Sequence, residues 1–384
     1  MEEKNIPQPD LEQETPTKTD KRRKIFILLT ALISFNLFVF GTLYVSLKKN
    51  NIENANPSSK VTFLGNSTPT PFPFQELTIP YLRERSYTSL LGELSRVSQN
   101  TDYTSYLTSY TSDGFKIFGQ LTIPKEDSSA SPQNDPSAGS GQAKKYPAII
   151  FVHGYIPPAN YQTLVNYAQY VDYLASNGFV VFKIDLRGHG SSEGKPGGSY
   201  YSSDYIIDVL NARAALQNSD FVNPDAIGLW GHSMAGNVIA RALAASPSIP
   251  AIVIWAGAVY TYEDFSEFRI QDSSYQPPSE DSPARQKRNE MFEKYGQFDP
   301  NSSFWKQVPM TNYLSDIKGA ISLNHAVDDA VVDIRYSRNL NSILENTTIP
   351  HELNEYASGG HNLNGAAFNQ AMENTVEFFN KYLK

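Results

Sequence analysis

From residue 146 to the C-terminus, the chain alternates short apolar runs with segments of helical periodicity. Several runs are almost continuously apolar, which is typical of parallel strands buried on both faces. Strands that alternate with helices predict a mostly parallel central sheet with helices on both faces, so the fold class is α/β. The predicted strands are Tyr146–Val152, Phe179–Ile184, Ala226–Trp230, Ile249–Trp255, Ala320–Leu323 and His351–Tyr356, and the predicted helices are Leu164–Ser176, Tyr205–Gln217, Ser233–Ala245, Ile334–Glu345 and Ala366–Leu383.

One interval breaks this alternation. Residues 257–318 form a long, charged and aromatic stretch between two predicted strands. Such an insertion would lie over the carboxyl ends of the strands, so we expect it to be a cap on the domain formed by residues 146–384. Its aromatic side chains, Tyr260 and Tyr275 among them, suit either an apolar substrate pocket or the core of the cap itself.

The stretch before this domain, residues 76–145, is predicted to be an extension that contains a β-hairpin. Two runs of strand-forming residues, Tyr103–Tyr110 and Phe115–Ile123, are joined by a Ser-Asp-Gly turn. A short helix is expected around Tyr81–Val97. Residues 125–145 are rich in Ser, Pro, Gly and Asn and predict a low-complexity surface loop.

Residues 25–47 form a run of 23 residues without a charge. At about 1.5 Å per residue, a helix of this length suffices for a hydrocarbon core about 30 Å thick. The alternative is a cleaved signal peptide, whose apolar core is usually only about 7–15 residues long. The longer run therefore favours an uncleaved transmembrane anchor, with residues 1–24 as a disordered tail and residues 48–75 as a stalk.

The flanking charges predict the orientation of this anchor. Residues 10–24 carry five Lys and Arg side chains, and residues 48–62 carry three. Because the more basic flank normally stays in the cytoplasm, we expect a single-pass membrane protein with a cytoplasmic N-terminus and an extracytoplasmic domain. The chain has no cysteine, which suits a bacterial cell envelope better than a eukaryotic secretory route.

Composition excludes several kinds of function. Asp and Glu outnumber Lys and Arg by 40 to 32, so the net charge is −8, which argues against a nucleic-acid partner. The absence of cysteine excludes disulfides, cysteine-based zinc sites, iron–sulfur clusters and a cysteine nucleophile. Any catalysis must therefore depend on Ser, Thr, His and the carboxylates.

The strongest local motif surrounds Ser233. The run Gly231-His232-Ser233-Met234-Ala235-Gly236 follows an apolar strand and opens a predicted helix. A serine at such a strand–turn–helix corner is exposed above the sheet, and small neighbours are needed because the turn is strained. The pattern Gly-x-Ser-x-Gly is here Gly-x-Ser-x-Ala, and Ala is still small enough for the turn.

A serine hydroxyl needs a base, and the base needs a carboxylate to orient it. Among the six histidines, His361 follows Gly359-Gly360 after the last predicted strand, where a glycine-rich loop can bring an imidazole over Ser233. Two adjacent acids, Asp328 and Asp329, follow the strand before it, at the same edge of the sheet. Neighbouring carboxylates in a loop normally point apart, so one of them can meet His361 while the other faces solvent. The chain order Ser, Asp, His is the order that an α/β-hydrolase sheet requires.

Residues from about 103 to the C-terminus resemble the α/β-hydrolase superfamily, and more closely the catalytic domains of prolyl oligopeptidase-type serine hydrolases that lack a propeller. The matching runs are SDGFKIFGQLTIP (112–124), YPAIIFVHGY (146–155), GFVVFKIDLRGHGSSEG (178–194), GLWGHSMAG (228–236), NHAVDDAVV (324–332) and GGH (359–361).

The resemblance implies Ser233 as the nucleophile, His361 as the base and Asp329, rather than Asp328, as the orienting acid. It also implies an oxyanion hole formed by the backbone N–H groups of Met234 and Tyr155. Such acyl transfer needs no metal and no organic cofactor.

The sequence therefore predicts a membrane-anchored serine hydrolase that cleaves ester or peptide bonds of small substrates. The pattern does not choose between peptidase and esterase. Two alternatives remain open, a non-catalytic binding or scaffold protein on a hydrolase fold and an acyltransferase. The oligomeric state is not predicted.

Overall fold

In the computed structural model, residues 71–125, 144–197 and 199–384 are described. The predicted tail (1–24) and membrane anchor (25–47) lie outside these ranges, as do most of the stalk and of the low-complexity loop. Among the helices in the described ranges, none combines the length and apolar character needed to cross a bilayer. The packed unit starts at Pro71, and Phe72 and Phe74 contact its core, so folded structure begins before residue 76.

Nine strands in the described ranges form one sheet, in the order β1-β2-β3-β5-β4-β6-β7-β8-β9. The first three strands are antiparallel, and β3 pairs antiparallel with β5, whereas the other six run parallel to one another. The sheet is therefore mostly parallel, as predicted. The strands are β1 (Ser95–Gln99), β2 (Tyr103–Ser112), β3 (Phe115–Pro124), β4 (Tyr146–Val152), β5 (Val180–Ile184), β6 (Val222–His232), β7 (Ala251–Trp255), β8 (Ala320–Ala326) and β9 (His351–Tyr356).

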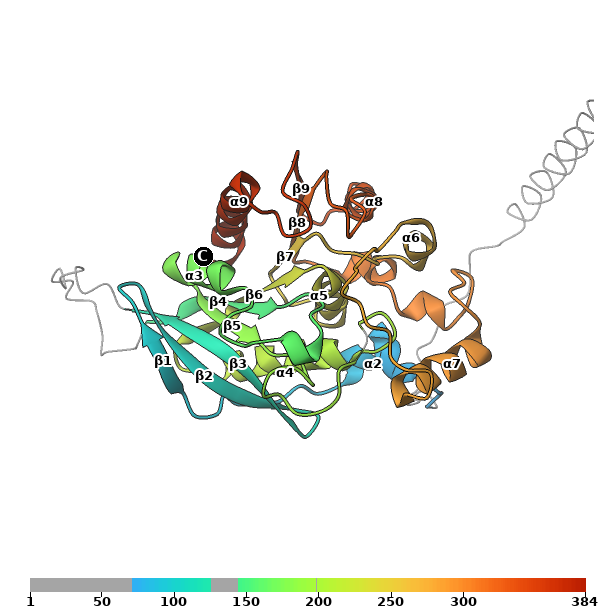
Figure 1. Cartoon of the computed structure of the whole chain (residues 1–384), viewed down its shortest axis with the longest axis horizontal. Helices are drawn as coiled ribbons and strands as arrows, with labels where there is room; N and C mark the ends of the chain where they lie inside the picture. The colour runs from blue at the N-terminus through green and yellow to red at the C-terminus, as the bar shows by residue number, and fades with distance from the viewer. Residues whose placement is uncertain (1–70, 126–143, 198) are drawn as a thin grey trace, which may run out of the picture. The chain divides into compact units, whose positions relative to one another are not determined.

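Helices cover both faces of the sheet (Figure 1). The alternation of side chains along β4 explains how: Ile149 and Phe151 join the core beneath α3 and α9, whereas Ile150 and Val152 join the core beneath α4 and α5. Both sets are fully buried, which accounts for the continuous apolar run in the sequence. The helices are α2 (Ile79–Glu84), α3 (Ala168–Ser176), α4 (Asp204–Gln217), α5 (Met234–Ala245), α6 (Tyr262–Glu267), α7 (Pro283–Tyr295), α8 (Arg335–Leu344) and α9 (Ala366–Leu383).

Two helix predictions were wrong in part. The expected helix around Tyr81–Val97 is only α2, because Arg85 turns to extended backbone and the chain then follows the hairpin, where the Gly92 N–H donates to the Ser109 carbonyl at 2.7 Å. The helix expected from Leu164 begins only at Ala168, because Tyr167 adopts a φ of 62°.

The insertion between β7 and β8 contains α6, α7 and two short 3₁₀ helices (Trp305–Gln307 and Met310–Asp316). Most of its aromatic side chains pack on one another: Tyr262 stacks on Phe298 with ring centroids 3.9 Å apart, and Phe298 also meets Trp305. Tyr275 is the exception, since 52% of its surface is exposed. Core packing thus explains these aromatic residues better than a substrate pocket does.

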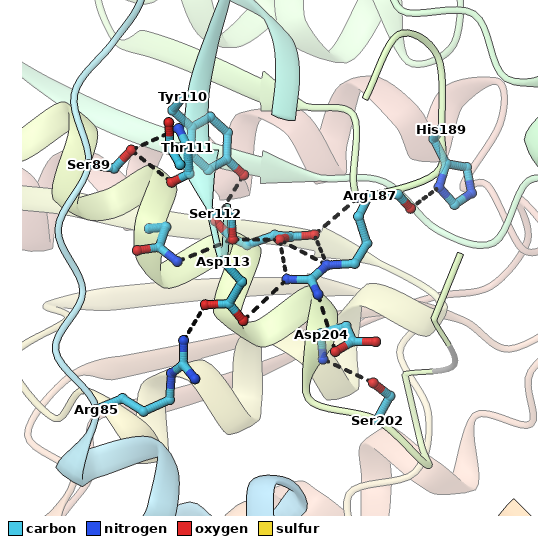
Figure 2. Close-up of polar contacts among 12 residues, drawn as sticks. Arg85, Ser89, Tyr110, Thr111, Ser112, Asp113, Arg187, His189, Ser202 and Asp204 are labelled. Carbon is cyan, nitrogen blue, oxygen red and sulfur yellow. Dashed lines mark hydrogen bonds and ion pairs between the residues drawn. The ribbon is translucent and has the colours of Figure 1, made fainter. Parts of the chain in front are cut away.

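A network of buried charges joins the N-terminal hairpin to the parallel part of the sheet (Figure 2). Arg187, after β5, donates two side-chain hydrogen bonds to Asp208 of α4, the shorter at 2.7 Å, and also pairs with Asp204 at 3.2 Å. Ser112, at the end of β2, donates to the same Asp208 carboxylate at 2.7 Å. The hairpin is therefore an integral part of the domain.

A second buried cation ties α5, the helix that begins directly after Ser233, to the N-terminal segment. The Arg241 guanidinium donates to the carbonyl oxygens of Leu77, Ser199 and Ser202. Burial lowers the pKa of Arg241 to about 10, so the group is still charged at neutral pH. These backbone carbonyls solvate the buried charge in place of a carboxylate.

We expect Arg187→Met to lower the free energy of unfolding by about 3–5 kcal/mol, because the buried Asp208 carboxylate loses its counter-charge. The Arg187 and Asp208 side chains are 6% and 0% exposed. Arg335→Met is the matched control: it removes a pair with Asp333 in which the side chains are 51% and 24% exposed, and should cost less than about 1 kcal/mol. Chemical denaturation measures both, and equal losses would contradict this account of the network.

Candidate active site

Ser233 lies at the junction between β6 and α5, with φ 56° and ψ −120°. This backbone conformation is strained for a residue that carries a Cβ atom. Two backbone hydrogen bonds of 2.9 Å hold it: the Ser233 N–H donates to the Trp255 carbonyl, and the Ser233 carbonyl accepts from the Gly236 N–H. The hydroxyl makes no capping bond to α5, and the residue lines a cavity of about 420 Å³.

The small residues around Ser233 are required by close backbone packing. A Cβ atom at Gly231 would lie 2.9 Å from the Ala235 carbonyl oxygen, and one at Gly236 would lie 2.8 Å from the Gly257 Cα atom. Ala235 is fully buried. The departure from Gly-x-Ser-x-Gly at this position therefore leaves the strand–turn–helix corner intact.

Asp329 follows β8, and its buried carboxylate accepts four N–H groups. Oδ1 accepts from the backbone of Val331 at 2.8 Å and of Val332 at 3.0 Å. Oδ2 accepts from the rings of His361 at 2.8 Å and His325 at 3.1 Å. Burial acts to raise the pKa of Asp329, but these hydrogen bonds outweigh it and hold the pKa well below its ordinary value. Asp329 is therefore an ionised acceptor at neutral pH.

His361 contacts Asp329 through Nδ1. An ionised carboxylate can only accept hydrogen bonds, so Nδ1 carries the proton and the Nε2 lone pair is left for another group. His361 and Ser233 line the same cavity. Between these two side chains, both within the described residues, the structure forms no hydrogen bond. Asp329 and His361 are thus joined by a hydrogen bond, and Ser233 lines the same cavity as His361.

Asp328, the alternative acid, has a different contact. Its carboxylate accepts the backbone N–H groups of Gly359 at 3.3 Å and Gly360 at 2.8 Å. The residue is exposed, as expected of the acid that turns away from His361. Asp328 therefore holds the backbone of the loop that carries His361 and does not bind the imidazole.

The structure brings in three side chains that the motif analysis did not select. His325 is fully buried; its Nε2 faces Asp329 and the Val332 carbonyl, and its Nδ1 lies 2.8 Å from the Ser337 hydroxyl. His232 and Tyr167 bond to each other beside the cavity. The sequence could have indicated His325, because it lies four residues before Asp329. Nothing in the sequence indicates that His232 pairs with Tyr167.

Of the two residues predicted to form the oxyanion hole, Tyr155 lines the cavity that contains Ser233, and Met234 follows Ser233 in the chain. Met234 is the first residue of α5, where backbone N–H groups lack an acceptor within the helix. Tyr155 follows β4 and lines the cavity. Its hydroxyl accepts the Gln276 N–H at 3.1 Å, and its ring packs edge-on against Tyr275 with centroids 5.4 Å apart. The insertion between β7 and β8 therefore reaches the cavity through residues 272–276.

The other loop histidines are structural. His153 and His189 are buried with ring centroids 4.8 Å apart, and burial is the main cause that lowers the pKa of both rings. His153 contacts the Gly154 carbonyl at 2.7 Å. Neither residue lines the cavity that contains Ser233. They lie in the loops that follow β4 and β5.

Asp329 predicts an acid-dependent loss of stability. The lowered pKa in the folded state stabilises the fold above the pKa of the unfolded carboxyl, about 3.9, and this contribution is lost as the pH falls below that value. Relative to Asp329→Asn, the wild-type free energy of unfolding should therefore fall between about pH 5 and pH 2, with a slope of at most about 1.4 kcal/mol per pH unit. Urea denaturation across this range tests it, and parallel pH curves for the two proteins would contradict the prediction.

Comparisons with known proteins agree with the fold and the motifs. A family model described as serine aminopeptidase, S33 matches residues 143–274. A thiohydrolase, aneE, of Aspergillus aculeatus is 33% identical over 126 residues, which is 33% of this chain and 33% of that protein. Alignments with the curated relatives span 25% to 35% of their lengths.

Solved structures show the same fold. Acetyl xylan esterase 1 from Thermoanaerobacterium sp. JW/SL YS485 matches 82% of this chain and 95% of its own, with a TM-score of 0.52 and 18% identity. A puromycin-hydrolyzing peptidase of Mycobacterium tuberculosis matches 74% of this chain and 40% of its own, with a TM-score of 0.55 and 16% identity. Together with the sheet topology and the Ser233 corner, these likenesses support the predicted superfamily. The described residues therefore have the α/β-hydrolase fold, and residues 143–274 match the serine aminopeptidase, S33 family model.

Proposed function

We propose that the protein hydrolyses small esters or short peptides through an acyl-enzyme on Ser233, with His361 as the base and Asp329 as the orienting acid. The observation that carries this proposal is the 2.8 Å bond between His361 Nδ1 and the Asp329 carboxylate, beside a cavity that Ser233 also lines. With Nδ1 protonated toward Asp329, the Nε2 lone pair is free to accept the Ser233 proton.

The reaction proceeds in two halves. Ser233 Oγ attacks the substrate carbonyl carbon while its proton passes to His361 Nε2, and the tetrahedral intermediate then expels the alcohol or amine, which takes that proton. A water molecule next loses a proton to Nε2 and attacks the acyl-enzyme, which releases the acid and restores Ser233. The imidazolium that forms in each half is stabilised by the Asp329 carboxylate.

The developing oxyanion requires two donors. The backbone N–H groups of Met234 and Tyr155 are the proposed pair, since both residues flank the Ser233 corner. Such donors are commonly worth about 3–4 kcal/mol of transition-state stabilisation. The start of α5 also gives the site a favourable helix dipole for a negative charge.

The walls of the cavity favour uncharged or cationic substrates. Four carboxamide residues line it, together with one carboxylate from Asp272, and no lysine or arginine is among the lining residues. Carboxamides pair equally well with hydroxyl and peptide groups, so esters of polar alcohols and short peptides both fit. The carboxamides are Asn166, Gln169, Asn362 and Asn364.

A fluorophosphonate probe tests the nucleophile. Wild-type protein should become labelled, and Ser233→Ala should lose labelling entirely, because the probe phosphonylates an activated serine. Ser266→Ala, an exposed serine in α6, should label like wild type. For the acid, Asp329→Asn should lower kcat by about 10³- to 10⁴-fold, since the imidazole loses its orienting acceptor.

The possible results separate the alternatives. Labelling that survives Ser233→Ala would refute the nucleophile assignment, and a wild-type protein that never labels or turns over substrate would favour a binding protein on the same fold. Loss of activity in Asp328→Asn but not in Asp329→Asn would transfer the acid role. If an added alcohol or amine captures the acyl group in preference to water, the enzyme is an acyltransferase.

We also propose that residues 25–47 anchor the protein in a membrane, with the N-terminus cytoplasmic and the hydrolase domain outside, as in a bacterial cell envelope. Support comes from the uncharged run and from the more basic flank before it. The full chain should sediment with membranes and resist carbonate extraction, whereas a double variant, Leu37→Arg with Val39→Arg, should not. Digestion of the domain by external protease in intact spheroplasts checks the orientation, and a soluble full chain would contradict the anchor.

A further inference from the structure

His232 occupies the position just before Ser233, and both residues line the same cavity. The residue is 3% exposed, and its Nε2 lies 2.8 Å from the backbone carbonyl oxygen of His361. Its ring centroid is 4.6 Å from that of His361. His232 therefore contacts the proposed base through the backbone as well as through the ring.

The partners of His232 determine which nitrogen carries the proton. A carbonyl oxygen can only accept, so Nε2 donates to His361. Burial lowers the pKa of His232 to about 3, so the ring is neutral and Nδ1 is an acceptor. The Tyr167 hydroxyl, 2.7 Å away, must then donate to Nδ1. Both ring nitrogens are satisfied in one tautomer only.

Tyr167 extends this chain of hydrogen bonds to the opposite side of the cavity. Its hydroxyl oxygen accepts the Gly154 N–H at 3.1 Å, next to Tyr155 of the proposed oxyanion hole. Burial raises the pKa of Tyr167 well above its ordinary value, so the group remains a phenol and can donate. The bonds therefore run from Gly154 through Tyr167 and His232 to His361, with every donor matched to an acceptor.

The loop that carries His361 needs such support. Gly359 and Gly360 precede it with φ values of 140° and 60°, a conformation that provides little rigidity of its own. Asp328 holds the two glycine N–H groups, and the Tyr170 hydroxyl holds the Asn362 carbonyl at 3.0 Å. The carbonyl of His361 itself is held by His232, so this contact lies nearest to the base.

We infer that His232 is a positioning residue, which fixes the backbone of His361 through Nε2 and is itself held in the correct tautomer by Tyr167. The inference rests on the proposed function of His361. The residue between glycine and serine in the Gly-x-Ser motif thereby has a role. It precedes the proposed nucleophile and positions the proposed base, His361. Loss of this tether should lower kcat and leave KM nearly unchanged, because the four carboxamides and Asp272 that line the cavity are not altered.

Two substitutions separate the two ends of the His232 ring. In His232→Gln the side-chain amide nitrogen can take the place of Nε2 and still donate to His361, whereas in His232→Asn the shorter amide can meet only Tyr167. We expect His232→Asn to lower kcat by about 10- to 100-fold with KM within twofold, a loss of the size that small misplacements of catalytic groups produce. His232→Gln should recover most of the rate.

Tyr167→Phe gives a second, milder test that keeps the ring. It removes the acceptor for Gly154 and the donor to His232. Only the second bond holds His232, so kcat should fall by about 3- to 10-fold, the range expected for one hydrogen bond. His351→Asn and His351→Gln are matched controls, since His351 begins β9 and, within the described part of the chain, its ring hydrogen-bonds only to the Ile349 carbonyl. Both should leave kcat and KM at wild-type values.

The outcomes can be told apart from a failure of the proposed function. If Ser233→Ala abolishes labelling but His232→Asn, His232→Gln and Tyr167→Phe all retain wild-type kcat, the positioning role is refuted and the nucleophile assignment stands. Equal kcat losses in the Asn and Gln variants, accompanied by equal falls in Tm, would also refute it, because they indicate general packing. A kcat loss in His232→Asn that His232→Gln reverses, at matched Tm, supports it.

Discussion

The Asp329 carboxylate is the contact on which the site depends. It is buried, and it is ionised because four N–H groups surround it, two from its own turn and two from the rings of His325 and His361. Each of those groups comes from a segment that the sheet places at the same edge. Because a buried carboxylate is stable only with such partners, the negative charge that orients His361 also holds the β8 turn and the histidine loop together.

The neighbouring carboxylate, that of Asp328, has a different hydrogen-bonding role from that of Asp329. Asp328 accepts the backbone of Gly359 and Gly360, whereas Asp329 accepts the imidazole. Two adjacent acids thus hold the loop that carries His361, one through the loop backbone and the other through the imidazole ring. His325, buried between Asp329 and Ser337, contacts the same Asp329 carboxylate oxygen as His361 does.

Much of this was readable in the sequence. The buried strands are continuous apolar runs, so their type and their positions along the chain could be predicted. Because parallel strands end at one edge of the sheet, Ser233, Asp329 and His361 could be expected to lie near one another. What failed was local. The helix predicted over Tyr81–Val97 gave way to hairpin contacts made by residues distant in sequence, and the start of α3 moved because Tyr167 takes a left-handed conformation. Tertiary contacts determine where both helices begin and end. Helical periodicity in the sequence carries no information about such contacts.

The partners of the catalytic candidates were hidden for the same reason. His232 and Tyr167 are 65 residues apart, and their pairing depends on β4 lying beside β6 in the sheet. The buried arginines are similar: Arg187 and Arg241 are ordinary in sequence, and only the fold surrounds one with carboxylates and the other with carbonyls. These buried polar side chains connect helices, strands and loops that are brought together by the packing of apolar residues.

The backbone at Ser233 has a consequence for how such a domain can change over time. Glycine tolerates a φ of 56° far better than serine does. In a lineage that retained the fold only to bind ligands, replacement of this serine by glycine would remove strain while it abolished the proposed acyl transfer. One substitution would then both inactivate and stabilise the protein. A serine that is retained in this strained conformation therefore indicates selection for a catalytic role.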